Sequence, residues 1–399
     1  FGSSFTQVCC AGCAGMSNAV TESLGKGGLP VVKLETASGA SCEICVYGGH
    51  VLSWRTADGT EQLMVSSIAD FQKGKAIRGG IPLCWPQFNE RGKYSRHGFA
   101  RTSDFKVRRQ RTQPDPSVTL ELGATEETQA KYPFSFVYTL TVTLEDSKLT
   151  MNVHVVNQDD EPLDFTTALH TYFAVSDVST ARVLGLKGLQ FESDGKTQTE
   201  TEASVAITGF TDRIYYKTSE VKLVDGPRTV TIQKSESLPD AVVWNIGEER
   251  SVELKDLGQD EWRKYLCVEA GAIGDRVVVP PGSSWNGEQR FISTMKVQET
   301  ISQEAISETA PEPINEEDDD AGGLSSQRLA EIEAAFEAKA KGGSIAIERA
   351  YKVMFTEEEK ALYPSKDFEE DVKTRFKDKM AKEGEFSWPE AKLFLEEVG

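Results

Sequence analysis

The sequence is poor in histidine, in long apolar segments and in regularly spaced cysteine, and each deficiency excludes a class of protein. Its 399 residues include only four histidines, and no two of them have the spacing of metal ligands. No apolar run approaches the roughly 18 residues that a membrane-spanning helix needs. The seven cysteines are odd in number and irregularly spaced, so they do not resemble the framework of a disulfide-stabilised secreted domain.

Two Cys-x-x-Cys pairs, Cys10/Cys13 and Cys42/Cys45, invite a redox or zinc-binding interpretation. Residues three apart on a strand point to opposite faces, so Cys42 and Cys45 are poorly placed to form a disulfide. We therefore expect buried free thiols in a reducing compartment. This favours an intracellular, soluble protein.

Positive charge is also scarce, because 63 acidic residues face 44 basic ones and the net charge is −19. Such a charge argues against nucleic acid and anionic membranes as partners. The deficit is uneven: residues 300–399 hold 25 acidic and 13 basic side chains, a net of −12 out of the −19. This asymmetry marks the C-terminal part as a separate unit.

Alternating apolar and polar residues dominate positions 30–298. In residues 136–144 the pattern is strict, and it resumes at 149–155 after the turn Glu145-Asp-Ser-Lys148, which predicts a β-hairpin with one face toward a core. Further strands are predicted at 42–55, 219–224, 229–233, 242–246, 264–269 and 284–297. Since no amphipathic helix intervenes, we expect a large antiparallel β-sandwich.

The two ends of the chain have different patterns. Residues 299–323 are acidic and rich in Pro and Gly, as in a linker. Residues 324–399 carry apolar positions every three or four residues, among them Phe368, Val372 and Phe376, which predicts a small α-helical domain. Its acidic surface suggests docking to a protein partner.

Residues 1–29 form a predicted N-terminal extension. The first 15 are small, hydroxylated and free of acidic residues, as in the remnant of a transit peptide. Met16 is an equally acceptable internal start for a cytosolic form. The sequence therefore leaves cytoplasm and plastid open as compartments.

Residues suited to binding or catalysis are concentrated in two segments, Arg78-Gly-Gly-Ile-Pro and His97-Gly-Phe-Ala-Arg101. Arginine suits bidentate contact with phosphate or carboxylate, because its guanidinium is a planar fork that stays charged. Gly79 and Gly80 allow turns or a close approach of the backbone to a ligand. These features predict a preorganised ligand-binding site rather than an ordinary surface loop.

These two motifs resemble those of the hexose-6-phosphate 1-epimerases, relatives of galactose mutarotase in the aldose 1-epimerase superfamily. Ala168-Leu-His-Thr-Tyr-Phe173 and Cys267-Val-Glu-Ala-Gly271 resemble two further motifs of that family, in the same order. The resemblance covers about residues 30–298. It implies the supersandwich fold of galactose mutarotase and the interconversion of the α and β anomers of a hexose-6-phosphate, with glucose-6-phosphate expected. It implies neither a metal nor a redox cofactor.

The resemblance also implies residue roles. Glu269 corresponds to the general base, His170 to the general acid, and His97 to a supporting donor. Arg78 and Arg101 correspond to a phosphate clamp, and we add Lys75 as a third candidate cation.

Departures from the family pattern concern three positions near the site. Ala270 stands where the family has proline. Phe191 and Ser193 stand where it has tyrosine and aspartate, with Asp194 one residue late as the candidate sugar ligand. Glu269 follows an apolar run and precedes Ala270-Gly271, so we expect it at a strand end before a turn. The departures and the acidic tail motivate an alternative, a non-catalytic sugar-phosphate-binding or structural subunit docked through its tail.

Overall fold

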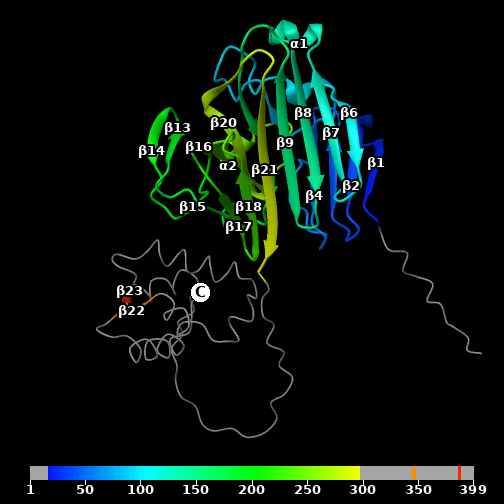
Figure 1. Ribbon diagram of the computed structural model, residues 1–399. Helices are drawn as coiled ribbons and strands as arrows, with labels where there is room; N and C mark the ends of the chain where they lie inside the picture. Colours follow the sequence, from blue (N-terminus) through cyan, green and yellow to red (C-terminus); the bar gives the residue numbers. More distant parts are fainter. Residues whose placement is uncertain (1–16, 297–343, 347–384, 388–399) are drawn as a thin grey trace, which may run out of the picture. The chain divides into compact units, whose positions relative to one another are not determined.

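The computed structural model describes residues 17–296, 344–346 and 385–387, and residues 17–296 form an almost all-β unit (Figure 1). Among these residues there are two short α-helices, α1 (Glu126–Lys131) and α2 (Gly247–Ser251), and three 3₁₀ turns, Lys26–Gly28, Ala100–Thr102 and Glu261–Lys264. None of these helices could cross a membrane. The predicted mainly antiparallel β architecture is confirmed.

Two large antiparallel sheets account for most of the strands. The nine-stranded sheet runs β15 (Ser204–Ala206), β12 (Arg182–Leu184), β17 (Val221–Asp225), β18 (Arg228–Lys234), β21 (Ser284–Met295), β9 (Lys148–Asn157), β8 (Phe136–Leu144), β7 (Ser117–Gly123), β6 (Lys106–Arg111). The eight-stranded sheet runs β14 (Lys196–Thr199), β13 (Gln190–Ser193), β16 (Thr211–Tyr215), β19 (Asp240–Asn245), β20 (Tyr265–Val279), β10 (Leu163–Leu169), β5 (Leu83–Cys84), with β11 (Tyr172–Ala174) also paired to β20.

A smaller sheet of four strands contains β1 (Ala19–Leu24), β2 (Pro30–Glu35), β3 (Ser41–Cys45) and β4 (His50–Arg55). The run that we predicted as one strand, 42–55, is therefore two strands joined by a turn with Gly48 and Gly49 at positive φ. β1 lies in the segment predicted as an extension, so the folded region begins before residue 30.

The hydrophobic core packs between the large sheets. The β8–β9 hairpin falls where the alternation predicts it, with Leu140 and Val153 as one of its paired core positions. Trp85, which follows β5, is fully buried against the rings of Phe136 and Tyr138 from β8 and of Phe165 from β10. This cluster anchors the chain between the two arginine motifs, since Arg78 precedes β5 and Arg101 follows it.

The C-terminal part of the chain, residues 302–399, is a second unit. Its described residues are two short strands, β22 (Ser344–Ala346) and β23 (Glu385–Ser387), which pair antiparallel with Ile345 opposite Phe386. The predicted linker (299–323) and almost all of the predicted helical domain lie outside the described residues, as does the segment 1–16.

Candidate active site

A cavity of about 500 Å³ brings together six of the seven predicted site residues. These six are Arg78, His97, Arg101, His170, Asp194 and Glu269. Lys75 is separate, because its ammonium group pairs with Asp70 at an exposed position and does not line this cavity. The structure therefore gives Lys75 no place beside the other two predicted phosphate ligands.

The face beneath the cavity is built from strand registry in the eight-stranded sheet. Antiparallel pairing places Trp244 of β19 opposite Cys267 of β20, and Tyr172 of β11 on the other side of Cys267. Two positions along, Val242 pairs with Glu269. Because side chains two apart on a strand share a face, Glu269 and Cys267 point to the same side of the sheet.

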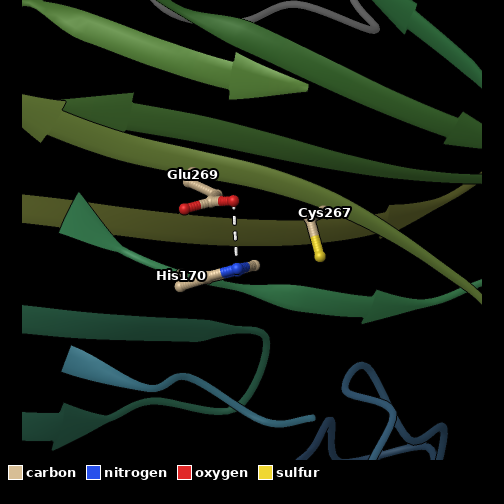
Figure 2. A group of neighbouring side chains, drawn as sticks. All are labelled: His170, Cys267 and Glu269. Atoms are coloured by element: carbon tan, nitrogen blue, oxygen red, sulfur yellow. Dashed lines mark ion pairs between the residues drawn. The ribbon is translucent and has the colours of Figure 1, made fainter. Parts of the chain in front are cut away.

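His170 lies between β10 and β11, directly opposite Glu269. The pairs Leu169–Ala270 and Tyr172–Cys267 bracket this position. His170 Nδ1 lies 3.1 Å from Glu269 Oε1, with the glutamate side chain 1% exposed and the histidine side chain 9% exposed. Figure 2 shows the ring and the carboxylate facing each other, with the Cys267 sulfur to one side.

Both members of this pair have bonding capacity left over. Among the described residues, His170 Nδ1 and Glu269 Oε2 are buried without a hydrogen-bond partner, so the 3.1 Å approach is a close contact that lacks hydrogen-bond alignment. Buried polar groups are normally paired. The pair is therefore poised to interact with a bound molecule.

The expected turn after Glu269 is wrong. β20 continues through Ala270 and Gly271 to Val279, so Glu269 lies inside a 15-residue strand. The glycine is there for close packing, since a Cβ at Gly271 would come within 2.8 Å of the Thr167 carbonyl oxygen on β10. The base candidate is thus held by a hydrogen-bonded sheet on both sides.

Burial shifts the two pKa values toward each other. Desolvation raises the pKa of Glu269 well above its usual value, and the nearby Asp212 carboxylate adds to the increase. Desolvation lowers the pKa of His170 well below its usual value, assisted by His97, Arg101 and Arg78. Both shifts favour the uncharged forms of the pair when the cavity is empty, that is, a protonated Glu269 beside a neutral His170.

His97 is held in one tautomer. Its Nδ1 lies 3.3 Å from the backbone N–H of Asn89, which donates to it, and 3.0 Å from Cys84 Sγ. The proton of the neutral ring is therefore on Nε2. Burial and the neighbouring Arg101 and Arg96 lower the pKa of His97 to about 3, so the ring is neutral and Nε2–H is a donor.

Arg78 is oriented by two partners. Its Nε and Nη2 donate to Asp256 Oδ1 at 3.2 and 3.1 Å, and Nη1 donates to the Tyr172 hydroxyl at 3.1 Å. Each terminal nitrogen keeps one further N–H. Gly79 serves backbone packing, since a Cβ there would meet the Met64 carbonyl oxygen at 2.3 Å.

The neighbouring Gly80 serves the same purpose. It has a φ of +61°, and a Cβ there would lie 2.3 Å from the Val51 carbonyl oxygen. Our expectation that the two glycines admit a ligand is therefore not what the geometry favours. Gly79 brings the Arg78 segment against Met64 and Val65, and Gly80 brings it against β4.

Three further arginines of the cavity wall have no carboxylate within ion-pair distance in the described part of the chain. They are Arg96, Arg101 and Arg250. Arg101 Nη2 donates to the Arg96 carbonyl oxygen at 3.1 Å, so these two arginines are linked within the loop that follows β5. Arg250 stacks over Phe210, with its guanidinium carbon 3.7 Å from the ring centroid.

Asp194 reaches the cavity through a tight turn. Asp194 and Gly195 join β13 to β14, and both have positive φ (49° and 70°), as in a type I′ hairpin. This explains how an aspartate one residue late is still directed to the site without a bulge. Phe191, two residues into β13, is buried against Tyr215.

The cavity residues that sequence reasoning missed include Arg96, Asp212 and Trp244. Arg96 directly precedes His97, so its charge beside the motif was a usable signal. Asp212 and Trp244 are cross-strand partners on β16 and β19, and only the strand registry brings them to the site.

Sequence comparison with known proteins identifies the family of this chain. The sequence profile of the aldose 1-epimerase family matches residues 30–291. A protein of Cenchrus ciliaris named "Putative glucose-6-phosphate 1-epimerase" is 36% identical over 277 residues, covering 65% of this chain and 83% of the relative. A protein of the same name from Escherichia coli is 30% identical over 232 residues, covering 56% and 77%.

Solved structures resemble the fold. A protein described as "a putative mutarotase" from Salmonella typhimurium superposes with a TM-score of 0.64 at 23% identity, covering 69% of this chain and 94% of that one. A galactose mutarotase-like protein from Clostridium acetobutylicum gives a TM-score of 0.59 at 18% identity, covering 70% and 99%. The galactose mutarotase-like fold expected from the motifs is confirmed.

Proposed function

Since the chain belongs to the aldose 1-epimerase family, we propose that it interconverts the α and β anomers of a hexose-6-phosphate, with glucose-6-phosphate as the expected substrate. The observation that carries the proposal is the His170–Glu269 pair, buried, 3.1 Å apart and open to a cavity. Relatives named as glucose-6-phosphate 1-epimerases support the choice of sugar phosphate.

Anomer exchange requires the sugar ring to open and close. A base removes the proton of the anomeric hydroxyl, an acid protonates the ring oxygen, and the bond between them breaks. Rotation about the next carbon–carbon bond followed by closure gives the other anomer. Two side chains with matched proton affinities are sufficient for this chemistry.

Glu269 is assigned as the base and His170 as the acid. The reactive form arises when one proton passes from Glu269 to His170 across their 3.1 Å contact. The Glu269 carboxylate then accepts the anomeric proton, while the His170 imidazolium protonates the ring oxygen; in the reverse direction the two exchange roles. The neutral His97 donates its Nε2–H to a sugar oxygen. This hydrogen bond stabilises negative charge at that oxygen without itself supplying a proton.

The arginines are assigned to the phosphate. Arg78 offers its two remaining N–H groups from a fixed orientation, and Arg101 offers a guanidinium with no carboxylate partner in the described residues. Arg96 joins them, because it lies in the same loop as Arg101 and also lines the cavity. A local cluster of this kind can hold a dianion despite the net charge of −19. Asp194 is the candidate partner for sugar hydroxyls.

The test is exchange between the anomers of glucose-6-phosphate, followed by NMR magnetisation transfer, with free glucose and galactose in parallel. The expected result is an exchange rate that rises with protein concentration for the phosphorylated sugar, and much less for the free sugars. Equal acceleration of all three would remove the phosphate assignment. No acceleration, with sugar-phosphate binding retained, would favour the alternative of a non-catalytic binding subunit.

The remaining expectations lie beyond the described site. We propose that residues 324–399 form a helical domain that docks the enzyme to a protein partner. We also propose a soluble, intracellular location, in the cytoplasm or in a plastid. Circular dichroism of the isolated segment and imaging of a tagged chain would test the two proposals separately.

A further inference from the structure

A third potential ligand lies beside the acid–base pair. Cys267 is two residues before Glu269 on β20, shares its face of the sheet and is fully buried. It does not line the cavity itself but lies next to two residues that do. The proton chemistry proposed above makes no use of this thiol.

The three side chains have the geometry of a metal site. One ring nitrogen of His170, Cys267 Sγ and one Glu269 oxygen all lie within 4.8 Å of one another (Figure 2). Ligands of one tetrahedral zinc ion are about 3.3 Å apart for nitrogen and oxygen and about 3.6 Å apart for nitrogen and sulfur. The observed 3.1 Å between His170 and Glu269 already matches, and the Cys267 sulfur lies within 4.8 Å of the other two ligand atoms.

Unsatisfied buried atoms point to a missing ligand. Within the described residues, His170 Nδ1 and Glu269 Oε2 have no hydrogen-bond partner. Both residues are more than nine-tenths buried, because His170 is 7% exposed and Glu269 is 1% exposed. Such groups are costly without a partner. A metal ion would satisfy both at once.

Charge and softness select the kind of ion. A thiolate and a carboxylate supply two negative charges, which a divalent cation cancels inside a buried site. Thiolate sulfur favours zinc-like ions, whereas magnesium and calcium prefer oxygen ligands. Three protein ligands with a fourth position open to a cavity is the arrangement that zinc adopts in accessible sites.

We infer that His170, Cys267 and Glu269 form a binding site for a thiophilic divalent cation, with Zn²⁺ as the type, and that the bound ion inhibits the enzyme. Binding forms Zn–N, Zn–S and Zn–O bonds and releases the thiol proton to solvent. The ion then occupies the atoms that transfer protons to and from the sugar. Only the inhibition rests on the proposed function; the binding does not.

The experiment uses the full chain with Cys9, Cys10 and Cys13 replaced by serine. These three thiols, which are close together in the sequence, then cannot contribute to the cobalt absorption spectrum. Co²⁺ is added to the chelator-treated protein as a spectroscopic substitute. We expect a thiolate-to-cobalt charge-transfer band together with the visible bands of four-coordinate cobalt, both abolished by added Zn²⁺. We also expect Zn²⁺ to inhibit anomer exchange, less effectively as glucose-6-phosphate is raised.

Variants locate the site. Cys267→Ala should abolish the cobalt bands and raise the Zn²⁺ concentration for half-inhibition at least tenfold, while exchange without metal is retained. Cys42→Ala, which removes a buried thiol of the four-stranded sheet, should change neither. Cys267→Ser serves if the alanine variant melts at a much lower temperature.

Two results would overturn the inference: no charge-transfer band in the background protein, or a band and inhibition that survive in both Cys267 variants. If the band is present but no exchange is detected in metal-free protein, the metal site stands and the proposed function fails. If exchange is normal but no charge-transfer band appears, the proposed function stands and the metal site fails.

Discussion

His170, in the two-residue connection between β10 and β11, faces Glu269 of β20, and the flanking backbone pairs Leu169–Ala270 and Tyr172–Cys267 hold them there. The 3.1 Å between their side chains therefore depends on the registry of the flanking strands. A slip of one residue would turn every side chain of β20 to the opposite face. The acid–base geometry and the fold are inseparable.

Replacing Glu269 by glutamine should remove the base while keeping its size. We expect kcat for anomer exchange to fall by about 10²–10⁴-fold, the usual contribution of a positioned general base, with sugar-phosphate affinity little changed. NMR exchange and calorimetric binding measure the two. Glu253→Gln, another carboxylate of the cavity wall, is the matched control and should retain most activity; near-normal exchange in Glu269→Gln would refute the assignment.

Replacing Asp212 by asparagine should shift the pH–rate profile. The Asp212 charge raises the pKa of Glu269 in addition to burial, so its removal makes ionised Glu269 easier to form and lowers that pKa. The limb of the bell-shaped profile that Glu269 controls should move to lower pH. Asp194→Asn is the control, and an identical shift there would show that Asp212 has no specific influence.

Replacing Arg101 by glutamine should reduce recognition of the phosphate. Loss of a charge-assisted hydrogen bond costs about 1.5–3 kcal/mol, so KM for glucose-6-phosphate should rise roughly 10- to 100-fold, with kinetics on free glucose unaffected. Lys75→Gln should leave both unchanged, because Lys75 is paired with Asp70 away from the cavity. A larger effect at Lys75 than at Arg101 would restore the assignment made from sequence.

Acid should destabilise the fold through buried neutral histidine. Burial lowers the pKa of His50 to about 4, below the value of about 6.5 in an unfolded chain. The unfolded state therefore binds the proton first, and the free energy of unfolding should fall by up to about 1.4 kcal/mol per pH unit between pH 6.5 and 4.

Urea unfolding at pH 7, 6 and 5 would measure this slope. His50→Gln should make the slope smaller, whatever its effect on stability at pH 7. His154, which is only half-buried on β9, is the control. An unchanged slope in His50→Gln would contradict the assignment.

Much of the fold was predictable because alternation reports burial on one face. The β8–β9 hairpin and β17, β18, β19 and β21 lie close to their predicted positions. β20 was cut short because Gly271 was interpreted as a turn residue. Its actual role, close packing against Thr167, depends on a neighbouring strand that the local sequence does not contain.

The candidate site was predictable where motifs carry it. His97, His170 and Glu269 lie in contiguous family-like segments, and the structure brings them to one cavity. Asp212 and Trp244 belong to no motif and meet only through pairing of β16 with β19. Lys75 was added for its charge alone, and charge does not report where a flexible side chain points.

Proton transfer and sugar recognition depend on different parts of the fold, and this has an evolutionary consequence. Glu269 is inside a sheet strand, whereas Arg96 and Asp194 lie in connecting turns, and turns accept substitution and insertion more readily than paired strands. Descendants of such a scaffold can change the sugars they accept by exchanging turn residues, while the proton-transfer pair is inherited intact. Diversity among such enzymes should therefore accumulate at the rim of the cavity.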